Sequence, residues 1–270
     1  MTKLEQLLDV ERLEVDLFRG ASPPTNLQRL FGGQVAGQAL VAATRTAPDD
    51  RAVHSLHGYF LNPGRPDLPV VYRVERLKDG RTFSSRRVSG IQAGRVIFNM
   101  AASFHVAEEG PVHQDPMPVV TPPEDLPVPE IADPEFNELV RLEWPGWELR
   151  RDTMTPAGAG ARQNVWLRYR EQLPDDPTLH VCALAYASDL MLLGSAMVPH
   201  QGVQVTMASL DHAMWFLRSF RADEWLLYAQ ASPSASSGRG LTQGQIFDRS
   251  GRLVAATVQE GLLRFEPPAR

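Results

Sequence analysis

The sequence predicts an α+β protein built from two similar halves, each with one central helix and a meander of antiparallel strands, that pack as a pseudo-dimer. Three features support this: a small-residue helical segment in each half, strand-like runs after it, and a proline-rich segment between the halves. A length of 270 residues suits two such units. We expect an N-terminal repeat over residues 1–110, a linker over 111–135 and a C-terminal repeat over 136–270.

One segment in each half has apolar residues at helical spacing. In the first half it is Gly33–Thr46, and in the second half it is Ser188–Met197. Ser188 or Asp189 is a suitable N-cap for the second helix, because their side chains accept hydrogen bonds from first-turn N–H groups. Both segments are rich in small residues, so we expect a curved sheet to wrap closely around them.

Strand-like runs bounded by turn residues follow each helical segment. Turns such as Lys78-Asp79-Gly80 and Asp248–Gly251 contain residues that tolerate positive φ or form local hydrogen bonds. The predicted strands are Val70–Arg76, Phe83–Ile91 and Arg95–His105 in the first half, and Glu224–Ala231, Leu241–Phe247 and Arg252–Arg264 in the second.

The segment between the halves contains eight of the 22 prolines, all between Pro111 and Pro134. Proline fixes φ and lacks an N–H donor, which excludes a helix interior or a central strand. We therefore predict an extended connector that runs over the surface.

Charge and cysteine content exclude several classes of protein. With 27 Lys and Arg against 32 Asp and Glu, the net charge of −5 disfavours a partner held through a nucleic-acid backbone. The single cysteine, Cys182, excludes an internal disulfide framework and a multi-cysteine metal site. No histidine pair or carboxylate cluster has metal-ligand spacing, so we expect neither a metal nor another cofactor.

The sequence also lacks the segments that direct a chain to a membrane. The N-terminal residues alternate acids with leucines, unlike a signal peptide, and no apolar run approaches the roughly 20 residues that span a bilayer. The C-terminal residues do not form a peroxisomal tripeptide. We expect a soluble, cytoplasmic protein without a membrane partner.

Seven motifs, spread in order from Phe31 to Leu263, resemble the type II acyl-CoA thioesterases: FGGQVAGQAL, HSLHGYFLNPG, RTFSSRRVSGIQ, LDHAMWF, EWLLY, SPSASSGRG and TVQEGLL. The resemblance implies a double hotdog fold and hydrolysis of fatty acyl-CoA to free fatty acid and coenzyme A. Because members of this family associate further, it also implies a homo-oligomer, a dimer or higher; exposed strand edges give a physical reason.

The same resemblance implies three catalytic residues: Asp189, Ser209 and Gln259. The family usually has threonine at the place of Ser209, and serine keeps the hydroxyl but loses the methyl group that stiffens χ1. Thr206 is nearby, yet on a strand it would face the opposite side from Ser209.

These residue types suit direct attack of water on a thioester. An aspartate can hold and deprotonate water, an amide and a hydroxyl can orient it, and N–H groups at a helix start can receive the oxyanion. We expect Asp189 to lie at or near such a helix start. Asp189 taken alone would more often be a helix N-cap.

Aligning the halves on His57 and His212 places Gln34 opposite Asp189, so the site residues occur only in the second half. We therefore expect one site per chain, with walls from the first half. His212 is expected to have a structural role. Gln34, His57 and Arg239 are further candidates for substrate binding, Arg239 through the phosphates of the coenzyme.

Two alternatives stay open. A hotdog enzyme of the enoyl-CoA hydratase type would need an Asp–His dyad, and no histidine accompanies Asp189 at a suitable spacing. A non-catalytic acyl-CoA binding module would need none of the three site residues. Turnover, as opposed to binding alone, distinguishes the latter from an enzyme.

Overall fold

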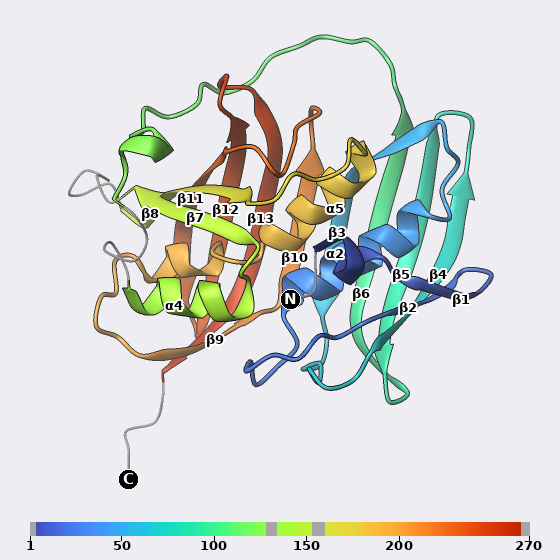
Figure 1. Cartoon of the computed structure of the whole chain (residues 1–270), viewed down its shortest axis with the longest axis horizontal. Helices are drawn as coiled ribbons and strands as arrows, with labels where there is room; N and C mark the ends of the chain where they lie inside the picture. The colour runs from blue at the N-terminus through green and yellow to red at the C-terminus, as the bar shows by residue number, and fades with distance from the viewer. Residues whose placement is uncertain (1–3, 128–133, 153–159, 266–270) are drawn as a thin grey trace.

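The computed structural model describes residues 4–127, 134–152 and 160–265. Within these residues the strands form one 13-stranded antiparallel sheet that lies behind and around two central helices (Figure 1). The first half, coloured blue to green, lies beside the second half, coloured yellow-green to red. This arrangement confirms the predicted α+β protein of two similar halves.

The six strands predicted from the sequence correspond to β4–β6 and β11–β13. The first half contains β1 (Glu11–Glu14), β2 (Leu17–Gly20), β3 (Arg51–Phe60), β4 (Val70–Asp79), β5 (Phe83–Gln92) and β6 (Arg95–Val106). The second half contains β7 (Trp147–Asp152), β8 (Arg162–Tyr169), β9 (Val205–Ser209), β10 (Asp211–Phe216), β11 (Leu226–Ser236), β12 (Arg239–Asp248) and β13 (Leu253–Phe265).

The strand order repeats outward from the centre of the sheet. It runs β1-β2-β4-β5-β6-β3-β10-β13-β12-β11-β8-β7, and β9 pairs with the end of β13. The halves meet where β3 and β10 pair, with His57 opposite Ala213. Each strand of the first half thus has a counterpart in the second half at the same distance from this pair.

Among the described residues, three α-helices have ten or more residues, namely α2, α4 and α5, and the other helical elements are short. The elements are α1 (Leu4–Leu8), α2 (Gly32–Thr44), α4 (Pro134–Glu143), α5 (Pro177–Ala187) and the 3₁₀ helices η1 (Pro123–Asp125) and η2 (Leu193–Met197). Helix α2 agrees with the predicted segment Gly33–Thr46 and is buried from Gly33 to Ala43.

The prediction of a helix over Ser188–Met197 is wrong. The central helix of the second half is α5, which lies just before that segment. The Asp176 side chain caps its start by accepting a hydrogen bond from the Thr178 N–H at 2.9 Å, and Pro177 occupies the first turn. Ser188 is the C-cap of α5, and only a 3₁₀ turn follows.

Helices α2 and α5 pack against each other at very short range. A Cβ atom on Gly33 would lie 2.1 Å from the carbonyl oxygen of Tyr186, so only glycine allows this approach. Both helices contribute their small side chains to the main hydrophobic core, together with the inner face of the sheet. The contact between the helices places the start of α2 beside the end of α5.

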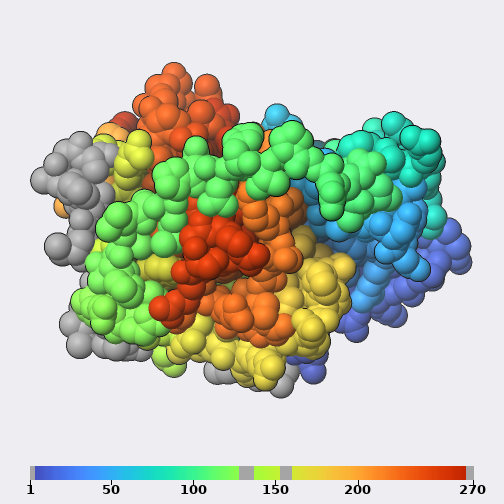
Figure 2. Space-filling model, turned by 90° about the horizontal axis from the view of Figure 1, so that it is seen from above, coloured from blue at the N-terminus to red at the C-terminus, as the bar shows by residue number. Residues whose placement is uncertain are grey.

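The linker is packed onto the second half. Figure 2 shows it as a green band that crosses the molecule from the first half to the second. Gln114 donates a hydrogen bond to the Gly251 carbonyl at 2.8 Å, and Met117 and Val120 cover a second apolar cluster that contains Trp166 and Trp225. The extended surface connector is thus observed, although residues 128–133 lie outside the described residues; the boundaries 1–110, 111–135 and 136–270 stay a prediction.

None of the helices among the described residues is long and apolar enough to cross a bilayer. In the same part of the chain, no three His, Cys, Asp or Glu side chains gather in a group that could hold a metal ion.

Candidate active site

Asp189 lies two residues beyond the end of α5, at the contact between the two central helices. The expectation that it begins a helix of its own is therefore wrong. The helix start near it belongs to α2, in the other half of the chain: a Cβ atom on Gly32 would stand 2.6 Å from Asp189 Oδ2. The main-chain N–H of Gly33 also forms a hydrogen bond with the carboxylate. An anion is favoured here, because first-turn N–H groups lack partners within the helix.

Ser209 and Gln259 both reach the carboxylate of Asp189. Ser209 Oγ donates a hydrogen bond to Asp189 Oδ1 at 2.8 Å, and Gln259 Nε2 donates to the same oxygen at 2.9 Å. Gln259 Nε2 also lies 2.6 Å from Ser209 Oγ, which accepts from it. The structure thus brings together the three residues that the sequence singled out, from the end of α5, from β9 and from β13.

Strand pairing fixes the geometry of this group. Strand β9 pairs with the end of β13, with Ser209 opposite Gly261, two residues from Gln259. Gln259 is fully buried, whereas Thr206 is exposed on β9. The hydroxyl at 209, and not the one at 206, therefore faces the carboxylate, as the alternation of side chains along a strand requires.

Burial raises the pKa of the Asp189 carboxyl above its ordinary value. The nearby imidazole of His212, the hydrogen bonds from Ser209 and Gln259, and the Gly33 N–H act in the opposite direction. A carboxylate with a raised pKa is a stronger base than an exposed one, which suits proton abstraction from water.

His212 is a member of this network that the sequence did not assign to the site. It is buried on β10, with Nδ1 3.1 Å from Gln259 Oε1 and Nε2 2.7 Å from Ser188 Oγ. Its place in the motif LDHAMWF, three residues after Ser209, was the available signal. Because His212 aligns with His57 in the other half, the sequence analysis gave it a structural role.

A cavity of about 800 Å³ opens in front of Asp189 and Ser209. Most of its lining is apolar, and it draws on both halves. The lining includes Leu27, Leu30, Phe31, Val35, Phe60, Ile97, Phe98, Leu139, Trp144, Leu190, Met191, Leu193, Met207 and Leu262. A lining of this kind can hold a long hydrocarbon chain, with its reactive end at the carboxylate.

The structure does not bring Gln34, His57 or Arg239 into the described lining of this cavity. Gln34 is buried in α2 and donates a hydrogen bond to the Ala21 carbonyl at 3.1 Å. His57 is exposed and packs edge-on against Trp215, with ring centroids 5.0 Å apart. A role for any of the three in substrate binding stays a prediction.

Arg239 begins β12 and is half exposed. Its guanidinium pairs with Glu260, with Nε 2.9 Å from Oε1. An anionic ligand would have to compete with this carboxylate for the arginine.

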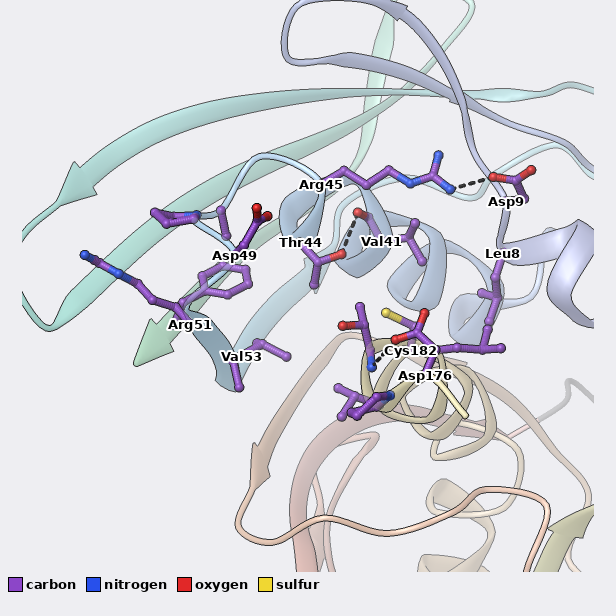
Figure 3. Close-up of a pocket in the computed structure, with 18 of the residues that line it drawn as sticks. Leu8, Asp9, Val41, Thr44, Arg45, Asp49, Arg51, Val53, Asp176 and Cys182 are labelled. Carbon is purple, nitrogen blue, oxygen red and sulfur yellow. Dashed lines mark hydrogen bonds and ion pairs between the residues drawn. The ribbon is translucent and has the colours of Figure 1, made fainter. Parts of the chain in front are cut away.

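A second cavity, of about 430 Å³, lies at the opposite ends of the same two helices (Figure 3). It is bounded by the end of α2 and the start of α5, the counterpart of the place that Asp189 occupies between the end of α5 and the start of α2. Polar groups here bind one another: Arg45 pairs with Asp9, and Thr44 Oγ1 donates to the Val41 carbonyl at 2.8 Å.

The first-half counterpart of Asp189 is Thr46, since each follows its central helix by two residues. The alignment of Gln34 with Asp189 is therefore wrong, because the chain from the helix to the next strands is longer in the second half. Thr46 binds Arg86, which is fully buried on β5: Arg86 Nε donates to Thr46 Oγ1 at 3.0 Å and Nη2 to its carbonyl at 2.7 Å. Arg86 also pairs with Asp79 at 2.8 Å.

Gln259 has no amide counterpart in the first half. Ala102 pairs with Arg86 across β5 and β6, just as Gln259 pairs with Thr242 across β12 and β13. The carboxylate, hydroxyl and amide thus occur together at one of the two ends of the helix pair.

Comparison with known proteins agrees with the fold. The acyl-CoA thioesterase family model matches residues 136–262, and the model for the N-terminal domain of acyl-CoA thioesterases matches residues 21–105. Acyl-coenzyme A thioesterase 8 of Mus musculus is 42% identical over 97% of this chain and 88% of its own length. The chain belongs to the acyl-CoA thioesterase family.

Solved structures identify the architecture. The acyl-CoA thioesterase II TesB2 of Mycobacterium marinum is 51% identical, with a TM-score of 0.87 over 99% of this chain and 100% of that one. A protein described as having a hot dog fold, from Alicyclobacillus acidocaldarius, is 20% identical with a TM-score of 0.81 over 98% of each chain, a likeness of fold alone. The predicted double hotdog fold is confirmed.

Proposed function

We propose that this protein hydrolyses fatty acyl-CoA to a free fatty acid and coenzyme A, by direct attack of a water molecule that Asp189 activates. The observation that carries the proposal is the half-buried Asp189 carboxylate, held by Ser209 and Gln259 at the head of an apolar cavity. The relatives compared above are named as acyl-CoA thioesterases, which supports the same substrate class.

The two carboxylate oxygens of Asp189 have different surroundings. Oδ1 accepts hydrogen bonds from Ser209 and Gln259, which fix the plane of the carboxylate. Oδ2 lies beside Gly32, near the start of α2, and we assign it the role of taking the proton from water. Ser209 and Gln259 therefore hold the base itself, a more specific role than orienting the water.

The proposed reaction has two steps, attack by water and departure of the thiolate. The water oxygen attacks the thioester carbonyl carbon while one of its protons passes to Asp189, and the carbonyl oxygen becomes an oxyanion. Collapse of this intermediate breaks the C–S bond, and the departing thiolate receives the proton. The other first-turn N–H groups of α2, beside Gly33, lack partners within the helix, and we assign them the role of stabilising the oxyanion.

A hydratase of the hotdog type is less well supported. Its Asp–His dyad would need a direct contact between the two side chains. Here Gln259 stands between them, because its amide binds Asp189 through Nε2 and His212 through Oε1.

Release of free thiol from a panel of acyl-CoAs tests the proposal, with wild type beside Asp189→Asn. We expect hydrolysis by wild type and a fall in kcat of about 100-fold or more in the variant, the scale of a lost general base. Binding of a non-hydrolysable thioether analogue should persist. Asp67→Asn is the matched control, because Asp67 is exposed and pairs with Arg65 at the surface, and it should keep wild-type kcat.

Binding of acyl-CoA by wild type without thiol release would instead support the non-catalytic binding module. Full activity in Asp189→Asn would show that the base lies elsewhere.

For the wider setting we propose a cytoplasmic homo-oligomer, a dimer or higher, with neither nucleic acid nor membrane as partner. The net charge of −5 supports the absence of a nucleic-acid partner. The outermost strands β1 and β7, each paired on one side in the sheet order, supply edges through which copies can associate. Sedimentation of the purified protein measures this association.

A further inference from the structure

The amide of Gln259 works only in one of its two orientations. Its Nε2 group donates to Asp189 Oδ1 and to Ser209 Oγ, at 2.9 and 2.6 Å. Rotated by 180°, the amide would turn its oxygen toward the carboxylate, and two acceptors would face each other. Because the two ends of an amide are nearly equal in size, packing does not select between these orientations. A hydrogen-bond donor next to Oε1 does select between them, because it binds the amide oxygen and not the amide nitrogen.

His212 is the group on that side. Its Nδ1 lies 3.1 Å from Gln259 Oε1, and an amide oxygen can only accept, so Nδ1 must carry a hydrogen. At the other side of the ring, Nε2 lies 2.7 Å from Ser188 Oγ, whose single hydrogen can point either to this nitrogen or to the Ala185 carbonyl at 3.0 Å. A neutral imidazole with its proton on Nδ1 satisfies both contacts.

The surroundings of His212 favour this neutral form. The side chain is 1% exposed, and burial lowers its pKa, although Asp189 and Asp211 act in the opposite direction. His212 is not among the residues that line the substrate cavity, as far as the described residues show. Its route to the reacting atoms therefore runs through Gln259.

We propose that His212 is a positioning residue for hydrolysis: neutral, with its proton on Nδ1, it holds Gln259 in the orientation that donates to Asp189 and Ser209. The inference rests on the proposed function and adds a group outside the Asp189, Ser209 and Gln259 set. The Gln259 amide oxygen requires the proton on Nδ1 of His212, and the Ser188 hydroxyl supports this tautomer when it points to Nε2 and not to the Ala185 carbonyl. The control of the base thus extends through two buried side chains, Gln259 and His212.

Three substitutions distinguish the contribution of Nδ1 from that of Nε2. In His212→Phe both contacts are lost, in His212→Gln the amide can still reach Ser188, and in His212→Asn the amide nitrogen takes the place of Nδ1 and can donate to Gln259. We expect kcat to fall by about 10- to 100-fold in the first two, since misplacement by about 1 Å can cost about 100-fold. In His212→Asn kcat should stay within about threefold of wild type, and KM should change by less than about threefold in all three.

A double-mutant cycle distinguishes positioning from a general structural role. In a Gln259→Ala background, His212→Phe should lower kcat by less than about twofold further, because its effect passes through the missing amide. An equal fall in both backgrounds would overturn the proposal. So would wild-type activity in His212→Phe.

The tautomer is measurable without any substrate. Nitrogen-15 spectra of the histidine side chains, with His212 assigned by its loss in His212→Asn, should show a neutral ring protonated at Nδ1. A proton on Nε2 alone would overturn the proposal even if the His212→Phe chain failed to fold. If wild type released no thiol from any acyl-CoA, the proposed function would fail, while this spectrum would still decide the orientation of Gln259.

Discussion

Gly32, in the first half of the chain, lies so close to Asp189, in the second half, that a Cβ atom on the glycine would stand 2.6 Å from the carboxylate oxygen Oδ2. The same Cβ would be 2.9 Å from the ring of Phe60, so it has no room to move away from the carboxylate. The base of the proposed reaction is therefore positioned by a residue far from it in sequence.

Gly32→Ala should lower kcat by about tenfold or more, because the added methyl group displaces the Asp189 carboxylate. Helix propensity alone would favour alanine by about 1 kcal/mol, so the variant is expected to fold. Thiol release measures kcat and thermal unfolding reports the fold. Gly110→Ala is the matched control, because a Cβ there has no neighbour within 4 Å, and it should match wild type in both measurements.

The pH dependence of kcat should have an acid limb above the ordinary aspartate pKa of 3.8. The base must be ionised to accept a proton, and burial raises the pKa of Asp189, so activity rises with pH through that raised value and falls as pH drops below it. A pH–kcat profile measures the midpoint. A limb at or below 3.8 would contradict the assignment of Asp189 as the base.

Ser209→Ala should move this acid limb to higher pH and lower kcat by about tenfold. The hydroxyl donates to the ionised carboxylate and lowers the pKa of Asp189, so its removal leaves burial less opposed. Ser209→Thr keeps the donor and should leave the limb unchanged. If the acid limb of Ser209→Ala lay at the same pH as in wild type, the group that sets this limb would not be the carboxylate that Ser209 binds.

Arg86→Leu should destabilise the fold by about 2–4 kcal/mol, without a change in KM for acyl-CoA. The change removes the ion pair with exposed Asp79 and leaves the buried oxygens of Thr46 without the hydrogen bonds that the guanidinium donates to them. Its neighbour Arg87 is exposed and pairs with Glu75, so Arg87→Leu should cost less than about 1 kcal/mol. Urea unfolding compares the two. A raised KM in Arg86→Leu alone would point to a substrate contact instead.

The second central helix shows where reasoning from the sequence failed. Ser188–Met197 has the apolar spacing of a helix, but the segment before it, Pro177–Ala187, forms α5. Its local signal was the Asp176-Pro177-Thr178 start, an N-cap followed by proline in the first turn. Because α5 is buried over most of its length, it lacks the polar face that periodicity relies on.

The histidines show a second limit. His57 and His212 share a similar sequence setting, yet one is exposed and the other is buried beside Gln259. Side chains alternate between the faces of a strand, so an offset of one residue reverses the face. The register that decides this is set by the pairing of β3 with β10, which puts Gly58 opposite His212 and joins segments about 150 residues apart.

The three site residues could be predicted from the sequence because each lies in a recognisable motif. Asp189, Ser209 and Gln259 were chosen by motif, and the structure places them within hydrogen-bonding distance. Gly33 and His212 also lie within motifs, but their contacts with the Asp189 carboxylate and with Gln259 come from packing between elements, which the motifs alone do not encode.

The covalent joining of two hotdog halves has a consequence for how such a protein can change. In a dimer of identical subunits, every substitution appears at both ends of the helix pair, so an improvement at one end must be tolerated at the other. Here one end presents Asp189 and the other presents Thr46 locked to Arg86. Because each residue occurs only once in the molecule, substitutions can adjust the reactivity of one end while the other end keeps a purely structural role.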